Sequence, residues 1–131
     1  MKPRGLRNHN PLNIKIGNDW RGEVELNTDG VFEQFTADYW GYRAAFIILR
    51  KYVRKYGRNT IRKIIHSWSP DGTEKEYSYM SKVSEWSGIG LDELLYYEDR
   101  DRMCRVVQAM ARFENGVEVD MTPIRVGYDA A

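Results

Sequence analysis

The amino-acid sequence predicts an α+β domain that is mainly helical, with one small β-hairpin and about four to five helices. Apolar residues recur at helical spacing through most of residues 39–116, and apolar and polar residues alternate within residues 20–35. The length of 131 residues is that of one domain, and contents of 42% hydrophobic and 13% aromatic residues exclude a disordered chain. We therefore expect a single domain over residues 1–131.

The N-terminal part of the chain is expected to contain little helix. Residues 1–19 are rich in Asn, Gly and Pro and have no helical period, which predicts an irregular segment. Residues 20–35 are predicted to form the hairpin, because apolar and acidic residues alternate from Glu23 to Leu26 before the turn-forming sequence Asn-Thr-Asp-Gly at 27–30.

The helices are expected between residues 39 and 116, and their ends are marked in the sequence. Gly57 follows an apolar stripe where a helix would stop, Thr60 is a suitable N-cap, and Pro70 stops the short helix that begins after Thr60. The helices are predicted at about residues 39–56, 61–68, 74–86 and 99–115. Residues 117–131 show little pattern and are predicted to form a tail.

The positive charges are concentrated in one stretch. The net charge is +1, but residues 39–70 contain eight Lys or Arg and no Asp or Glu, so this stretch carries +8 and the remainder −7. The eight residues, called here the basic stripe, are Arg43, Arg50, Lys51, Arg54, Lys55, Arg58, Arg62 and Lys63. Such a stripe fits an anionic partner such as nucleic acid. The alternative is a solvated helix face whose charge is offset by the acidic remainder.

Several classes of protein lack support in the sequence. No apolar run approaches the ~20 residues of a membrane span, and residues 1–10 lack the apolar region of a secretory signal peptide. The single cysteine, Cys104, excludes an internal disulfide and a multi-cysteine zinc site. His9 and His66 lack the spacing of metal ligands, and there is no phosphate-binding glycine loop, so no cofactor is expected.

Glu114 is the strongest candidate for a catalytic residue. The apolar stripe of Met103, Val107 and Met110 continues to position 114, so the Glu114 carboxyl group is expected on the core-facing side of the final helical turn. Partial burial and the helix C-terminus both favour its protonated form. A carboxyl group that stays protonated near neutral pH can give a proton to a glycosidic oxygen. The alternative is a Glu that turns outward from a frayed last turn.

Further acidic and aromatic side chains are available for sugar chemistry. The candidates for a second catalytic carboxylate are the acids of the predicted hairpin: Glu23, Glu25 and Asp29. The candidates for stacking against sugar rings are Trp20, Trp68 and Tyr79. The alternatives are that acids on a strand face are solvated and that the aromatic residues belong to the core or its rim.

Several short stretches of the sequence are distinctive. They are RGLRNHNPLNIK at 4–15, WRG at 20–22, GYRA at 41–44, YG at 56–57, TI at 60–61, II at 64–65 and FENG at 113–116. They resemble a family of small phage- and prophage-encoded proteins that are labelled virion structural proteins and look lysozyme-like. The resemblance covers nearly the whole chain. It implies a location in the phage virion, or in the host cytoplasm before release to the cell wall, with other virion proteins as partners.

The order of the motifs is similar to that of a circularly permuted lytic transglycosylase or bacterial glucosaminidase. Residues 10–15 resemble the Asn-containing segment of those enzymes, residues 49–57 their helix ending in Tyr-Gly, and residues 76–83 their Tyr-Val helix. The helix that carries the acid comes first in those enzymes, whereas the matching helix ends at Gly116 here and comes last. The resemblance implies a lysozyme-like fold and Glu114 as the acid.

The same resemblance implies substrate-binding roles for Asn10 and Asn13, which would position the acetamido group or the backbone. Two stretches depart from the pattern. His66-Ser-Trp68 stands where transglycosylases have Ala-Tyr-Asn, and residues 73–76 read Thr-Glu-Lys-Glu where the phage family has Glu-Asn-x-Thr. These departures put the substrate contacts of the loop opposite the acid in doubt.

Together these features predict an enzyme that binds peptidoglycan glycan strands and cleaves their β-1,4-linked aminosugar backbone, as a glycosidase or a lytic transglycosylase. If no second carboxylate is suitably placed, the substrate's own hydroxyl would attack. The alternative is a non-catalytic virion structural or cargo protein that keeps the lysozyme-like fold and turns the basic stripe to nucleic acid or another virion protein. The permuted order also predicts that residues 10–14 lie beside the end of the last helix, in contact with Glu114.

Overall fold

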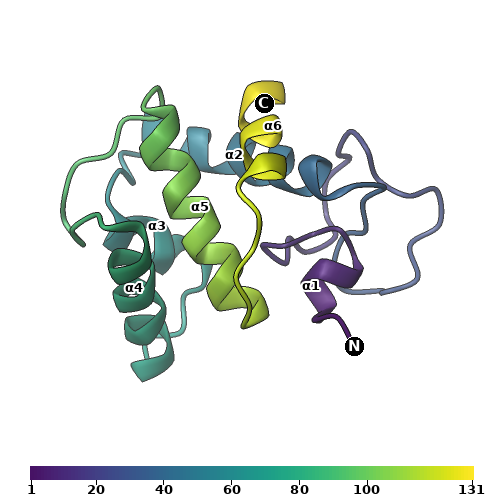
Figure 1. Cartoon of the computed structure of the whole chain (residues 1–131), viewed down its shortest axis with the longest axis horizontal. Helices are drawn as coiled ribbons and strands as arrows, with labels where there is room; N and C mark the ends of the chain where they lie inside the picture. The colour runs from purple at the N-terminus through teal and green to yellow at the C-terminus, as the bar shows by residue number, and fades with distance from the viewer.

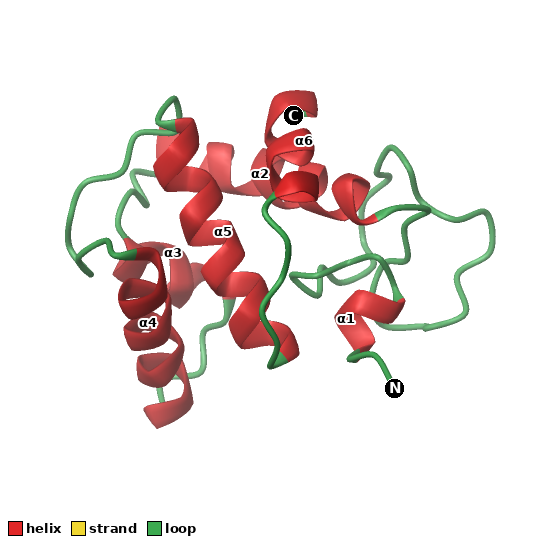
Figure 2. Cartoon of the chain, in the orientation of Figure 1, coloured by secondary structure: helices red, strands yellow, loops and turns green.

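The computed structural model describes all residues from Met1 to Ala131 as six helices joined by loops, with no β-sheet (Figure 2). The helices are α1 (Arg4–Arg7), α2 (Asp38–Lys55), α3 (Ile61–Trp68), α4 (Glu74–Ser87), α5 (Arg100–Asn115) and α6 (Thr122–Ala130). The fold is therefore all-helical, and the predicted α+β class is wrong. None of the six helices combines the length and the apolar composition that a membrane crossing requires.

Helix α5 lies at the centre of the fold (Figure 1). It contacts α4 on one side and α1 and α6 on the other, and eight of its 16 residues are buried. The buried residues include Met103, Val107 and Met110, because their spacing of three and four residues places them on one face of the helix. Glu114 lies on the same stripe, one turn after Met110.

The ends of the helices follow the capping residues that the sequence indicates. The Thr60 hydroxyl accepts a hydrogen bond from the Lys63 amide at 3.2 Å and so begins α3. Gly88 and Gly116 adopt left-handed backbone conformations, with φ of 73° and 72°, and end α4 and α5. Because α5 stops at Gly116, Glu114 lies in its final turn.

The hairpin predicted at residues 20–35 is replaced by an irregular loop. Two isolated bridges pair Lys15 with Phe32 and Glu23 with Phe35, and a few backbone hydrogen bonds accompany them, but no strand forms. The prediction failed because the apolar residues of the alternating stretch do not form a buried face: Leu26 is 79% exposed and Val24 is only partly buried. The loop projects from one end of the molecule, away from α3 and α4 (Figure 1).

Side chains hold this loop in place of a strand ladder. The side-chain oxygen Oδ1 of Asn27 accepts hydrogen bonds from the backbone amides of Asp29 and Gly30. The Asp29 carboxylate in turn accepts from the amides of Val31 and Phe32. Short polar side chains thus satisfy backbone groups that would otherwise pair with a neighbouring strand.

The two ends of the chain also differ from the prediction. Residues 1–19 contain the short helix α1, and the predicted tail at 117–131 contains the nine-residue helix α6. Helix α6 packs across α2, with Ile124 and Gly127 buried in the contact. Pro123 lies at the start of α6, where a fixed φ suits the first turn. Pro123 is the only feature of the sequence that indicates the start of this helix.

Gly127 lets α6 approach α2 closely, and this contact gives a testable prediction. A Cβ atom at position 127 would lie 2.6 Å from Tyr42 Cβ and 2.8 Å from the Arg43 amide nitrogen. Gly127→Ala should therefore destabilise the protein by about 1–3 kcal/mol in urea unfolding. In a helix with free space around the glycine, Gly→Ala stabilises the protein by up to ~1 kcal/mol. The sign of the change in unfolding free energy therefore tests whether α6 packs closely against α2.

Gly17→Ala is the matched control for Gly127→Ala. No atom lies within 4 Å of the Cβ position at Gly17, so this variant should unfold like the wild type. A Gly127→Ala protein as stable as the wild type, or more stable, would contradict the close contact of α2 and α6.

Candidate active site

The Glu114 carboxyl group is held at both oxygens by residues from distant parts of the chain. Asn13 Nδ2 donates a hydrogen bond to Glu114 Oε1 at 2.9 Å, and the Tyr79 hydroxyl donates to Oε2 at 2.8 Å. Asn13 belongs to the N-terminal loop and Tyr79 to α4. The prediction that residues 10–14 contact Glu114 at the end of its helix is therefore confirmed.

The loop that carries Asn13 is closed by a buried Asn10. Asn10 Nδ2 donates to the carbonyl oxygens of Ile14 at 2.9 Å and Glu33 at 3.0 Å, and its Oδ1 accepts from the Ile14 amide at 3.0 Å. Asn115 then ties the loop to α5, because its Nδ2 donates to the Pro11 carbonyl at 2.8 Å. Asn10 is fully buried, and its hydrogen bonds to the backbone stabilise the loop from the inside of the fold.

Two backbone features allow this close approach. Asn13 has a φ of 54°, in the left-handed region that Asn adopts more readily than most residues. Gly5 of α1 packs directly over the contact. A Cβ atom at Gly5 would lie 2.6 Å from Asn115 Oδ1 and 3.0 Å from Asn13 Oδ1, so a larger residue there would push the two asparagines aside.

Burial raises the pKa of the Glu114 carboxyl above its ordinary value. The hydrogen bonds from Asn13 and Tyr79, and the positive charge of Lys75, act in the opposite direction and reduce this rise. Tyr79 itself is buried and stacks on Phe113 at a ring distance of 4.2 Å. Burial, with the nearby Glu114, raises the Tyr79 pKa well above its ordinary value, so Tyr79 remains a neutral hydroxyl that donates to Glu114.

A groove runs along the surface beside Glu114. A cavity of about 370 Å³ is lined by Leu12, Asn13, Lys15, Phe32, Trp68, Ser69, Pro70 and Glu114. A second cavity of about 240 Å³ shares Asn13, Lys15 and Trp68 with the first and extends to Ile14, Ile48 and Tyr52. The two adjoining cavities are called here the Glu114 groove. Its walls combine aromatic rings with one carboxyl group and one ammonium group.

Four of the residues singled out from the sequence come together at this groove: Asn13, Trp68, Tyr79 and Glu114. Trp68 lines both cavities, whereas Tyr79 lies beneath Glu114 and supports it. Trp20 lines neither cavity. It packs against the core, and its backbone amide donates to Glu23 Oε1 at 3.0 Å.

The candidates for a second carboxylate lie elsewhere. Glu23 and Glu25 line a separate cavity of about 410 Å³ together with Asp19 and Glu33. Asp29 pairs with Arg4 at 2.7 Å and holds the backbone of the 20–35 loop. Glu114 is therefore the one carboxyl group among the residues that line the Glu114 groove.

Lys15 and Phe32 line the groove but were not predicted from the sequence. They face each other through the isolated backbone bridge, and the Glu33 amide donates to the Ile14 carbonyl at 2.9 Å beside it. Phe32 was assigned to the predicted hairpin, and Lys15 was noted only as part of a motif. Their position depends on the fold of the 20–35 loop, which the residue pattern did not reveal.

The five arginines of the basic stripe all make contacts within the protein, but only two of the eight cations pair with a carboxylate. Arg62 pairs with Asp92 at 2.9 Å, Arg54 pairs with Glu98, and Arg43 donates to the Ala130 carbonyl. The remaining arginines of the stripe lie over aromatic rings: Arg50 over Tyr97 and Arg58 over Tyr52 and Tyr56. Acidic side chains therefore offset part of the charge of the stripe, whereas Lys51 and Lys63 have no ion-pair partner and Lys55 lies over Tyr56.

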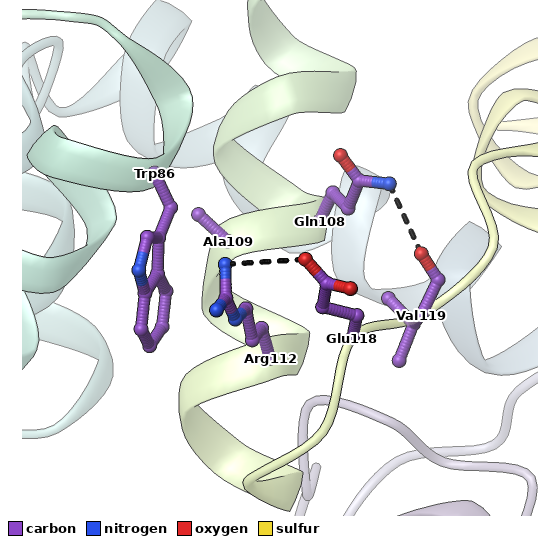
Figure 3. A pocket seen from close by; sticks show the side chains of 6 residues that line it. All are labelled: Trp86, Gln108, Ala109, Arg112, Glu118 and Val119. Atoms are coloured by element: carbon purple, nitrogen blue, oxygen red, sulfur yellow. Dashed lines mark hydrogen bonds and ion pairs between the residues drawn. The ribbon is translucent and has the colours of Figure 1, made fainter.

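A further cavity of about 320 Å³ lies on another face of α5 (Figure 3). Figure 3 shows Arg112 between Trp86 and Glu118. The guanidinium group lies 4.1 Å from the Trp86 ring centroid, and its Nη1 lies 3.6 Å from Glu118 Oε1. The two charged groups of this cavity therefore neutralise each other, and the cavity contains no group comparable to Glu114.

The Tyr79 hydrogen bond gives a prediction about Glu114. Tyr79→Phe removes a donor that favours the carboxylate, so the pKa of Glu114 should rise further above its ordinary value. An NMR titration of the Glu114 side-chain carbon measures this shift without any activity assay. Tyr77→Phe, an exposed position on the same helix, should leave the Glu114 pKa unchanged. An unchanged or lower pKa in Tyr79→Phe would contradict the hydrogen bond.

Glu33 gives a second prediction, on stability and pH. Burial and the neighbouring Glu23 raise the pKa of Glu33 to about 7, so the folded protein keeps this carboxyl protonated above the pH at which the unfolded chain releases the proton. Its contribution to stability is complete below about pH 4.5 and is lost as the pH rises through about 7. Glu33→Gln should remove this pH-dependent loss of stability, because the Gln side chain has no proton to release.

Thermal unfolding between pH 5 and 8 measures the effect of Glu33→Gln. The variant should gain stability over the wild type as the pH rises. Glu25→Gln, an exposed acid on the same loop, is the control and should follow the wild type. A constant difference between Glu33→Gln and the wild type across this range would contradict the raised pKa.

No protein-family model matches the chain. The chain is similar to Protein P5 of Pseudoalteromonas phage PM2, with 42% identity over 117 residues that cover 86% of this chain and 71% of the phage protein. The similarity spans most of the fold described above. The chain therefore belongs to the same family as this phage protein.

Proposed function

We propose that the protein cleaves the β-1,4-linked aminosugar backbone of peptidoglycan and that Glu114 is its general acid. The observation that carries the proposal is a half-buried carboxyl group with a raised pKa, held at both oxygens, on the wall of an aromatic groove. The motif resemblance to lysozyme-like proteins supports the proposal, and the phage relative supports a phage origin of the family.

The environment of Glu114 suits proton transfer to a leaving group. A raised pKa keeps a larger fraction of the carboxyl groups protonated near neutral pH than an exposed Glu would have. Asn13 and Tyr79 each donate one hydrogen bond to a different oxygen of Glu114, and together they fix the plane of the carboxyl group. Each oxygen keeps a second lone pair, and one of these can hold the proton. In the reaction, this proton passes to the glycosidic oxygen as the bond from that oxygen to the anomeric carbon breaks.

The groove supports a substrate-assisted reaction. Glycosidases that use water or an enzyme nucleophile need a second carboxylate at about 5–9.5 Å from the acid. No second carboxylate lines the Glu114 groove. A hydroxyl of the same sugar then attacks the anomeric carbon, and the Glu114 carboxylate takes the hydroxyl proton. This sequence returns Glu114 to its starting state and is the transglycosylase type of cleavage.

Trp68 and Tyr52 give the groove its affinity for sugar rings. Their ring centroids lie 6.4 Å apart in an edge-to-face arrangement, and both line the second cavity. Apolar faces of sugars stack on such rings, and the groove extends from Glu114 past Trp68 to Tyr52. Asn13 is engaged with Glu114, so its proposed role is to position the acid.

The alternative, a non-catalytic virion component that binds nucleic acid through the basic stripe, has less support. Its arginines are paired with Asp92, Glu98, a backbone carbonyl or aromatic rings. Nucleic-acid binding depends on cations that are free to replace counterions. Salt-dependent retention of DNA in the absence of wall clearing would favour this alternative.

Glu114→Gln tests the proposed function. The amide keeps the shape of the side chain and can accept from Asn13 while it donates to the Tyr79 oxygen, but it has no proton to transfer. Clearing of purified cell walls should fall by about 10²–10⁴-fold, the usual contribution of general acid catalysis. Folding should be retained, and stability near neutral pH should rise slightly, because the buried carboxyl no longer ionises.

Glu118→Gln is the matched control, since this side chain is 81% exposed and lies beyond the end of α5. It should clear walls at the wild-type rate. Wild-type clearing by Glu114→Gln would place the acid elsewhere. An inert wild type on every wall tested would favour the virion-structural alternative.

A further inference from the structure

Lys15 is fixed at the junction of the two cavities of the Glu114 groove. Its side chain lines both cavities, as do those of Asn13 and Trp68. Its backbone is anchored by the bridge to Phe32, and the next residue, Ile16, donates to the Val31 carbonyl at 3.0 Å. The Lys15 side chain therefore starts from a held backbone position at the junction of the two cavities.

The charge of Lys15 has no partner in the folded protein. No carboxylate lies within 4 Å of its ammonium group, whereas many of the arginines on the surface are paired. The cation that acts on Glu114 is Lys75, from the first turn of α4. Lys15 is therefore an uncompensated positive charge in a groove whose other lining residues, except Glu114, are neutral.

We propose that Lys15 binds a carboxylate carried by the glycan strand and so selects peptidoglycan over neutral aminosugar polymers. This inference rests on the proposed function. An ammonium group on a flexible stem forms charge-assisted hydrogen bonds to a carboxylate without a fixed geometry. Peptidoglycan offers such carboxylates on its lactyl ether or on its stem peptide, whereas chitin offers none.

The position of Lys15 suits this selection. Trp68 and Tyr52 provide rings that accept any aminosugar, so stacking alone does not distinguish one polymer from another. Lys15 lines both the cavity that contains Glu114 and the cavity that contains Tyr52, so a strand that occupies both would pass it. Because Lys15 is exposed, its ammonium group stays hydrated when a neutral strand binds, and it adds affinity only for strands that carry a carboxylate.

The test measures binding in a Glu114→Gln background, where strands are not cleaved. The probes are chito-oligosaccharides, which are neutral; peptide-free glycan strands, which carry lactyl carboxylates; and peptide-bearing strands, whose carboxylates lie on the stem peptide. Lys15→Met removes the charge and keeps the length of the side chain. Lys15→Arg keeps the charge, and Lys51→Met removes an exposed charge on α2 as the control.

Lys15→Met should weaken binding of carboxylate-bearing strands by about three- to tenfold, while Lys15→Arg and Lys51→Met bind them normally and chito-oligosaccharide binding is unchanged. A loss confined to peptide-free strands identifies the lactyl carboxylate as the ligand. A loss confined to peptide-bearing strands identifies the stem peptide.

Two results would overturn the inference while the proposed function stands. One is an equal loss of affinity for the neutral oligosaccharides, and the other is normal binding of every strand by Lys15→Met. If Glu114→Gln binds no glycan strand and the wild type clears no wall, the proposed function fails, and the role of Lys15 fails with it.

Discussion

The contact between the N-terminal loop and the end of α5 is the interaction on which the groove depends. Asn13 and Glu114 are 101 positions apart, yet one hydrogen bond of 2.9 Å joins them, and the neighbouring Asn115 donates to the Pro11 carbonyl. The loop carries Lys15 to the groove, and α5 carries Glu114. This contact thus brings together two walls of the groove that come from opposite ends of the chain.

The surroundings of Glu114 balance opposing effects on one carboxyl group. Hydrogen bonds to a charged group contribute about 1.5–3 kcal/mol each and favour the carboxylate, and two of them reach Glu114. Burial still raises the pKa, so desolvation is the larger effect. The result is a carboxyl group that is oriented by its neighbours and yet retains its proton more strongly than an exposed Glu. Orientation and protonation are thereby provided by different contacts.

The sequence predicted those parts of the site that follow from local rules. The spacing of Met103, Val107 and Met110 placed Glu114 on the inner face of its helix, and Gly116 ended that helix as expected. The groove wall at Lys15 and Phe32 could not be predicted, because side chains that bond to nearby backbone amides replaced the strand ladder that the alternating pattern indicated. Helix α6 was missed since only two of its nine residues are buried, too few for a periodic signal.

The Asp29 carboxylate affects the pH range over which the loop beside the groove keeps its shape. Asp29 holds the Phe32 amide and pairs with Arg4, which keeps the pKa of Asp29 far below its usual range. This contribution to stability disappears only in strong acid, whereas Glu33 and Glu114 favour the folded state when they are protonated. Mild acid therefore leaves all three carboxyl groups in the states that the fold prefers. For these three groups, a rise in pH costs the fold more than mild acidification does.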